Sequence, residues 1–97
     1  MIKNPYRKKI KKSFLLNIRC GHCKKDFAVY QKVGRGNVLR MYVSRIIECA
    51  VDLKPLPSQL NCPNCGQYIA DKIELKEKSA IAYRMRRSSY NTEEIHS

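Results

Sequence analysis

The feature that most constrains this chain is a pair of short cysteine motifs. Residues 20–23 read Cys-Gly-His-Cys and residues 62–65 read Cys-Pro-Asn-Cys, with Gly66 directly after the second motif. Each motif holds two thiols on one tight turn, so both sulfur atoms can point toward a single centre. Gly21 and Gly66 permit backbone conformations that other residues resist, and Pro63 favours a turn. Two such turns brought together supply four thiolates, which is the ligand set of a structural zinc site.

The separation of the two motifs is long for such a site. It is 38 residues, whereas zinc sites commonly separate their cysteine pairs by about 15–20 residues. A long hairpin inserted over residues 27–60 would account for the difference. The knuckle at residues 62–66 resembles those of the zinc-ribbon class, although the first knuckle has Lys24 where glycine is usual. The resemblance covers little beyond the knuckles. It implies a metal site on an antiparallel ribbon, of a kind common in transcription and translation proteins.

One structural Zn²⁺ is the predicted cofactor. Four thiolates also suit a single iron or an iron–sulfur cluster, because softness and geometry alone do not separate iron from zinc. A redox motif of the thioredoxin type would need a βαβ context, which the sequence lacks. His22 is expected to be a surface side chain, and the fifth cysteine, Cys49, a buried small apolar residue. The predicted metal ligands are Cys20, Cys23, Cys62 and Cys65.

The length and composition predict one small domain. The chain has 97 residues, no Trp and two Phe, so a metal would compensate for a thin core. No apolar run approaches the roughly 20 residues of a membrane span, and no segment of signal-peptide type follows the basic N-terminus. We therefore expect a cytoplasmic protein without a membrane partner. In that compartment paired cysteines indicate metal more often than disulfides.

The net charge of +12 is confined to the first half of the chain. Residues 1–47 hold thirteen Lys or Arg and one acidic residue, whereas residues 48–97 hold seven basic and seven acidic residues. Charge that is so unevenly distributed indicates a polyanionic partner. The alternative is a basic surface that only keeps the protein in solution.

The hydrophobic pattern predicts a small, mainly-β fold, with a zinc-ribbon-like antiparallel sheet. Residues 1–12 are expected to form a flexible basic arm, residues 13–87 a single domain and residues 88–97 a polar, frayed tail. Residues 14–19 and 27–30 have the alternation or composition of strands. These two strands would form a hairpin with the first cysteine motif at its tip.

The sequence predicts the secondary structure less clearly in the middle and toward the end of the chain. Residues 34–37 predict a hairpin turn, and residues 38–51 fit either a strand or a helix, with β-branched and aromatic content favouring the strand. The prolines in residues 52–59 predict a rigid loop. Residues 67–75 read as strand. Residues 79–87 read as a last edge strand, whose basic cluster is a second candidate contact surface.

Two functional hypotheses follow. In the first, a metal core holds a nucleic-acid-binding module rigid while basic residues contact phosphates and Tyr42 stacks on a base. RNA is preferred to DNA because exposed aromatic side chains favour unstacked bases. In the second, the protein is an adaptor that docks on a transcription or translation assembly through its neutral second half. An enzyme is not expected, because four cysteines close the metal's coordination. The candidate nucleic-acid contacts are Lys8, Lys9, Lys11, Lys12, Lys24, Lys25, Arg35, Arg40, Tyr42 and Arg45.

Overall fold

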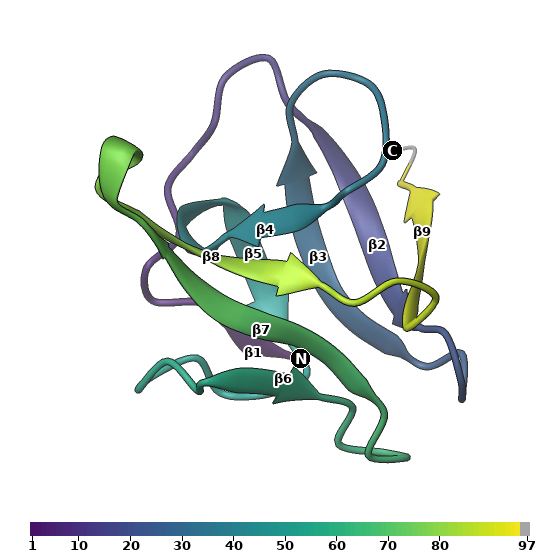
Figure 1. Cartoon of the computed structure of the whole chain (residues 1–97). Helices are drawn as coiled ribbons and strands as arrows, with labels where there is room; N and C mark the ends of the chain where they lie inside the picture. Colours follow the sequence, from purple (N-terminus) through teal and green to yellow (C-terminus); the bar gives the residue numbers. More distant parts are fainter. Residues whose placement is uncertain (96–97) are drawn as a thin grey trace.

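The computed structural model describes residues 1–95, and they are almost entirely β structure in two antiparallel sheets (Figure 1). The first sheet has the order β1 (Ile2–Lys3), β5 (Ile46–Cys49), β3 (Asp26–Lys32), β2 (Phe14–Cys20), β9 (Tyr90–Glu94). The second has the order β4 (Arg40–Tyr42), β8 (Ala80–Met85), β7 (Tyr68–Leu75), β6 (Gln59–Asn61). The helical elements within residues 1–95 are two single 3-10 turns, η1 (Val43–Arg45) and η2 (Lys76–Lys78). The predicted small, mainly-β fold with antiparallel sheets is confirmed.

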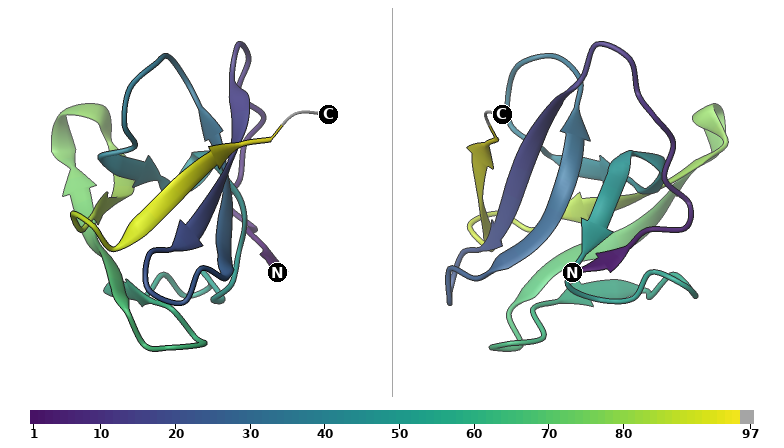
Figure 2. Two further views of the ribbon diagram at one scale, coloured as in Figure 1. Left: turned by 90° about the vertical axis from the view of Figure 1, so that its right-hand side faces the viewer. Right: turned by 180° about the vertical axis from the view of Figure 1, so that it is seen from behind.

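The two sheets form two layers around a shared core, with strands β4, β8 and β7 lying across β2 and β3 (Figures 1 and 2). Each sheet contributes large apolar side chains to the space between them, and burying each one stabilises the fold by about 1.5–3 kcal/mol. No helix in residues 1–95 has the length and apolar character needed to cross a membrane. The largest buried side chains include Ile18, Phe27 and Tyr30 from the first sheet and Met41, Ile69 and Tyr83 from the second.

Strands β2 and β3 form the predicted hairpin with the first cysteine motif at its tip. They pair from Phe14 opposite Lys32 as far as Arg19 opposite Asp26. On β2, every second side chain from Leu16 onward is buried, while the residues between are more exposed. The alternation of apolar and polar residues in β2 therefore predicts both that the segment is a strand and which of its faces is buried.

The long inserted hairpin predicted for residues 27–60 is not confirmed. Strands β3 and β4 lie in different sheets, so residues 34–37 connect the sheets and do not turn a hairpin. Residues 38–51 are extended, as the composition indicates, but they are divided between both sheets. Strand β4 pairs with β8, the turn η1 redirects the chain, and β5 pairs with β3. The alternation breaks at residues 45–47, where the chain changes sheet.

The predicted flexible N-terminal arm is not confirmed either. Strand β1 pairs with β5, and Asn4 is 2% exposed. The Asn4 side-chain amide donates hydrogen bonds to the carbonyls of Val43 (2.7 Å) and Ile46 (2.8 Å). Asn4 lies within a run of basic residues, and nothing in the sequence indicates that its side-chain amide is buried.

A second buried amide holds the basic residues that follow. The Gln31 side chain donates to the carbonyls of Lys8 (2.8 Å) and Arg45 (3.4 Å). Its oxygen accepts from the backbone N–H of Ile10 at 3.1 Å. The Lys8 N–H in turn donates to the Ser44 carbonyl at 2.7 Å. Residues 1–10 are thus tied to β3, η1 and β5.

The end of the chain also differs from expectation. Strand β8 lies between β4 and β7, so the prediction of an edge strand in residues 79–87 is wrong. The segment predicted as a frayed tail contains β9, which pairs with β2, and residues 96–97 of that tail lie outside the described residues. Arg19 of β2 joins this arrangement through ion pairs of 3.0 Å with both Asp26 and Glu93.

Candidate metal centre

The structure brings the four paired cysteines together. Their sulfur atoms all lie within 4.8 Å of one another. The sulfurs of Cys20 and Cys65 are 3.5 Å apart, and those of Cys23 and Cys62 are 3.6 Å apart. A disulfide would need about 2.05 Å, whereas tetrahedral zinc with bonds of about 2.3 Å places its sulfurs about 3.8 Å apart. The cluster therefore has the dimensions of a four-thiolate site for one metal ion.

Two turns of the same form position these sulfurs. In each turn the N–H of the first cysteine donates to the carbonyl of the fifth residue after it, and its carbonyl accepts from the N–H of the fourth. The partners in the first turn are Lys25 (2.9 Å) and Lys24 (3.0 Å), and those in the second are Gln67 (2.9 Å) and Gly66 (2.8 Å). The structure thus gives both motifs equivalent geometry, although only the second has the usual zinc-ribbon sequence.

The equivalent positions Lys24 and Gly66 both have left-handed backbones, with φ of 66° and 83°. Glycine adopts this conformation without cost, whereas lysine does not. Gly21 has a different role from the one expected, because its φ is not positive. A Cβ there would lie 2.9 Å from the carbonyl carbon of Ser89 and 3.0 Å from the Ser88 oxygen. Gly21 is needed so that the first turn can pass close to the segment before β9.

The electrostatics of the cluster favour a bound cation. The N–H of Lys25 and the side chain of Asn64 lower the pKa of Cys23 to about 6. The N–H of Gln67 acts to lower the pKa of Cys65, but desolvation and the other three sulfurs outweigh it and raise that pKa to about 11. The Cys23 thiolate thus forms readily, whereas the neighbouring sulfurs disfavour ionisation of Cys65. A divalent cation removes this opposition and holds all four cysteines as thiolates.

The centre lies where the two sheets meet. Cys20 and Cys23 lie at the tip of the β2–β3 hairpin in the first sheet, whereas Cys62 and Cys65 lie between β6 and β7 in the second. The loops after β2 and β6 lie side by side at one end of the molecule (Figure 1). A metal bound by all four sulfurs would therefore cross-link the sheets.

The other candidate metal-binding side chains stand apart. His22 is exposed. Cys49 lies on β5, fully buried and outside the cluster, and desolvation raises its pKa to about 11. Its burial agrees with the role expected for it, a small apolar core residue.

The ten candidate nucleic-acid contacts do not form one surface. Lys24 and Lys25 lie at the tip of the β2–β3 hairpin, beside the sulfurs. Residues 8–12 and Arg35 lie near the open end of the same hairpin, before β2 and after β3. Strands of seven residues are about 20 Å long, so these groups lie at opposite ends of the first sheet.

Some of the candidate nucleic-acid contacts do lie together, around Tyr42 of β4. The Arg45 guanidinium carbon lies 4.6 Å from the centre of the Tyr42 ring. The Lys78 ammonium donates to the Tyr42 hydroxyl at 3.1 Å. This hydrogen bond, followed by the charges of Lys78, Arg40 and Arg45, lowers the pKa of Tyr42. We call Arg40, Tyr42, Arg45 and Lys78 the Tyr42 cluster. The sequence gave no signal for Lys78, because it is 36 residues from Tyr42 and comes from η2.

Comparisons with protein-family models, with curated proteins and with solved structures find no match to this chain. Its function is therefore inferred from its own geometry. Two features of that geometry bear on function: the four-sulfur centre between the sheets and the Tyr42 cluster on β4.

Proposed function

We propose that this protein is a nucleic-acid-binding module built on one structural zinc ion, with RNA as the preferred ligand. The Tyr42 cluster is the observation that carries the proposal. Zinc is proposed for the metal because four sulfur donors at tetrahedral spacing suit it. Four protein ligands also leave no open position for a substrate, so we infer that the metal has a structural and not a catalytic role.

The Tyr42 cluster has the chemistry that single-stranded nucleic acid requires. Unstacked bases stack on tyrosine rings and on guanidinium planes, and cations beside them hold the phosphates. Within residues 1–95, Arg40, Arg45 and Lys78 form no ion pair. Their charge therefore remains available for a phosphate.

The buried amides of Asn4 and Gln31 support the same proposal. They fix residues 1–10 against η1, so Lys8 and Lys9 are held on an ordered segment next to Arg45. A surface that is ordered before binding loses less conformational entropy when the ligand arrives.

Fluorescence anisotropy with a single-stranded RNA oligonucleotide tests this function. We expect affinity to fall as salt rises, with a slope of log K against log salt of about −0.7 per contacted phosphate. Tyr42→Ala should weaken binding by about 1–3 kcal/mol, the value of one base–aromatic stack. Tyr6→Ala is the matched control, because Tyr6 is an exposed aromatic residue outside the Tyr42 cluster.

The same titration decides between ligands. A DNA oligonucleotide of the same sequence should bind more weakly than RNA. Absence of binding at low salt, or binding that does not depend on salt, would contradict the proposal. Capture of a protein partner that survives nuclease treatment would then favour the adaptor hypothesis.

A further inference from the structure

A basic groove runs beside the Tyr42 cluster. Its volume is about 710 Å³, and its walls come from β4 and the three residues before it, from β7 and β8, and from the turn before β9 and the start of β9. Within the described part of the chain, three arginines and no acidic residue line it. Apolar side chains, including those of Leu39, Ile73 and Leu75, line it as well. Leu39, directly before β4, is 71% exposed, so its apolar side chain is accessible to a ligand. The three arginines are Arg40, Arg84 and Arg87.

Two of these arginines are placed against each other. Arg40 of β4 and Arg84 of β8 are directly opposite in the antiparallel pairing. Like charges in this position destabilise a sheet. Asp71 faces Arg84 from β7, but its carboxylate interacts with Arg86 and with the Tyr68 hydroxyl. Among residues 1–95, the three groove arginines form no ion pair.

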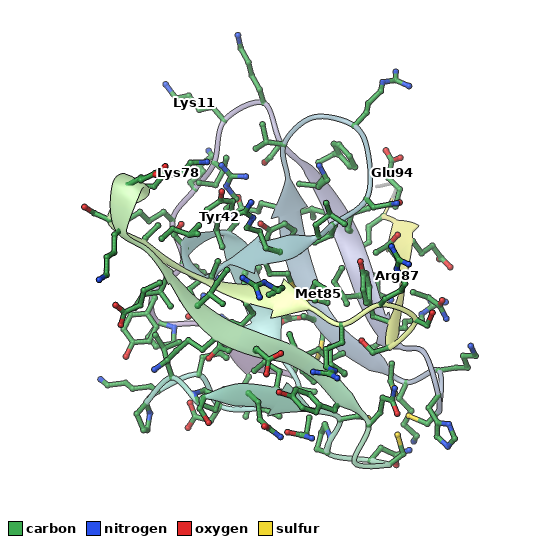
Figure 3. The ribbon with its side chains drawn as sticks, in the orientation of Figure 1. Lys11, Tyr42, Lys78, Met85, Arg87 and Glu94 are labelled. Atoms are coloured by element: carbon green, nitrogen blue, oxygen red, sulfur yellow. The ribbon has the colours of Figure 1, made fainter. Side chains whose placement is uncertain are left out.

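The groove is continuous with the Tyr42 cluster. Arg40 and Tyr42 are two residues apart on β4, so they share one face of the sheet about 7 Å apart. Arg40 also lines a neighbouring hollow together with Lys78, Glu74 and Glu77. Figure 3 shows Tyr42 and Lys78 at one side of the molecule and Arg87 toward β9. The path from Lys78 through Arg40 and Arg84 to Arg87 thus crosses the molecule.

We propose that the groove binds a segment of single-stranded RNA, with phosphates on Arg40, Arg84 and Arg87 and a base against Leu39. This inference rests on the proposed function and extends the binding surface beyond the Tyr42 cluster. The volume is that of a small-molecule pocket, enough for individual nucleotide units. A duplex keeps its bases stacked inside and cannot place one against an apolar floor. The groove therefore selects a single strand over a duplex.

The test removes two groove charges. Arg84→Gln with Arg87→Gln is compared with Lys54→Gln with Lys72→Gln, which removes two exposed charges outside the groove. Both are titrated with a single-stranded RNA oligonucleotide across a salt series. The groove variant should bind at least tenfold more weakly, and its salt slope should fall by about 0.7 for each arginine lost. The lysine control should stay within about twofold of the unaltered protein.

Two further measurements complete the design. Leu39→Ala should weaken binding without changing the salt slope, because it removes apolar contact and no charge. The same RNA sequence presented as a duplex should bind at least tenfold more weakly than the single strand. Circular dichroism and metal content check that each variant folds, and Arg87→Gln alone, in the turn before β9, replaces the double variant if that one fails to fold.

The outcomes separate the groove from the proposed function. If the arginine variant matches the lysine control while Tyr42→Ala still weakens binding, the groove assignment is overturned and the nucleic-acid function stands. Equal affinity for the duplex also overturns the groove. If the unaltered protein does not bind the oligonucleotide at low salt, both proposals fall.

Discussion

Gly21 and Gly66 occupy different positions in two equivalent turns, Gly21 inside the first motif and Gly66 directly after the second, and each is required for a different reason. Gly66 has a left-handed backbone, and a Cβ added there would meet nothing within 4 Å. Gly21 lacks the left-handed backbone, and its added Cβ would meet the backbone of Ser89 at 2.9 Å. Gly21 allows the first turn to approach the backbone of Ser89 closely, and Gly66 allows the left-handed backbone conformation of the second turn.

This difference predicts different costs for the two alanine variants. Gly66→Ala should lower the free energy of unfolding by about 1 kcal/mol, through backbone conformation alone. Gly21→Ala should cost more, about 2–3 kcal/mol, because backbone must move. Lys24→Gly, which relieves a left-handed lysine, should have the opposite sign and stabilise the fold slightly. Chemical denaturation of the metal-loaded proteins measures all three. An equal cost for both alanine variants would contradict the close approach at Gly21.

Single residues differ in how far the sequence alone could place them. The paired cysteines converge as their spacing indicates, because each turn is local and carries its own geometry. Cys49 is buried, as its lack of a partner motif implies. The contact between Lys78 and Tyr42 depends on how distant strands align, and no local pattern encodes that alignment.

At the scale of elements, the positions of the strands were more predictable from the sequence than the pairing of those strands into sheets. Strands β2, β3 and β7 fall where alternation or β-branched residues indicate. Sheet membership was not predictable, because β4 and β5 are three residues apart in the sequence yet enter different sheets, and no local pattern specifies the partner of each strand. The separation of the cysteine pairs predicts the inserted hairpin, and the run of basic residues predicts the flexible N-terminal arm. Long-range strand pairing and hydrogen bonds give a different structure in both places.

Gln31 supplies the test at this scale. Gln31→Ala removes the side-chain hydrogen bonds to Lys8, Ile10 and Arg45. Partly buried backbone groups would lose their partners, which should cost about 1 kcal/mol and release residues 5–12 from β3 and η1. Hydrogen exchange should then show faster exchange at Ile10. Gln59→Ala is the control, since Gln59 is exposed. Unchanged protection at Ile10 in the Gln31 variant would show that β1 and Asn4 suffice to hold the segment.

For the whole molecule, the main question is what joins the two sheets. The apolar core lies between them, and the cysteine centre connects them at one end. The core is small, and domains of this size have total stabilities of about 5–15 kcal/mol. Structural zinc supplies on the order of 10 kcal/mol in small domains. The metal is therefore expected to contribute as much as the rest of the fold.

Removal of the metal should consequently unfold both sheets together. A strong chelator is expected to abolish the β-sheet circular dichroism signal, and Cys20→Ser should prevent metal loading. Cys49→Ala should retain one metal ion per chain, because Cys49 is buried outside the sulfur cluster. Elemental analysis and circular dichroism of the three samples make the comparison. A metal-free protein with slow hydrogen exchange in both β3 and β7 would show that the apolar core alone holds the sheets together. If only β6 and β7 lost protection, the metal would stabilise the second sheet and would not act as a link between the two.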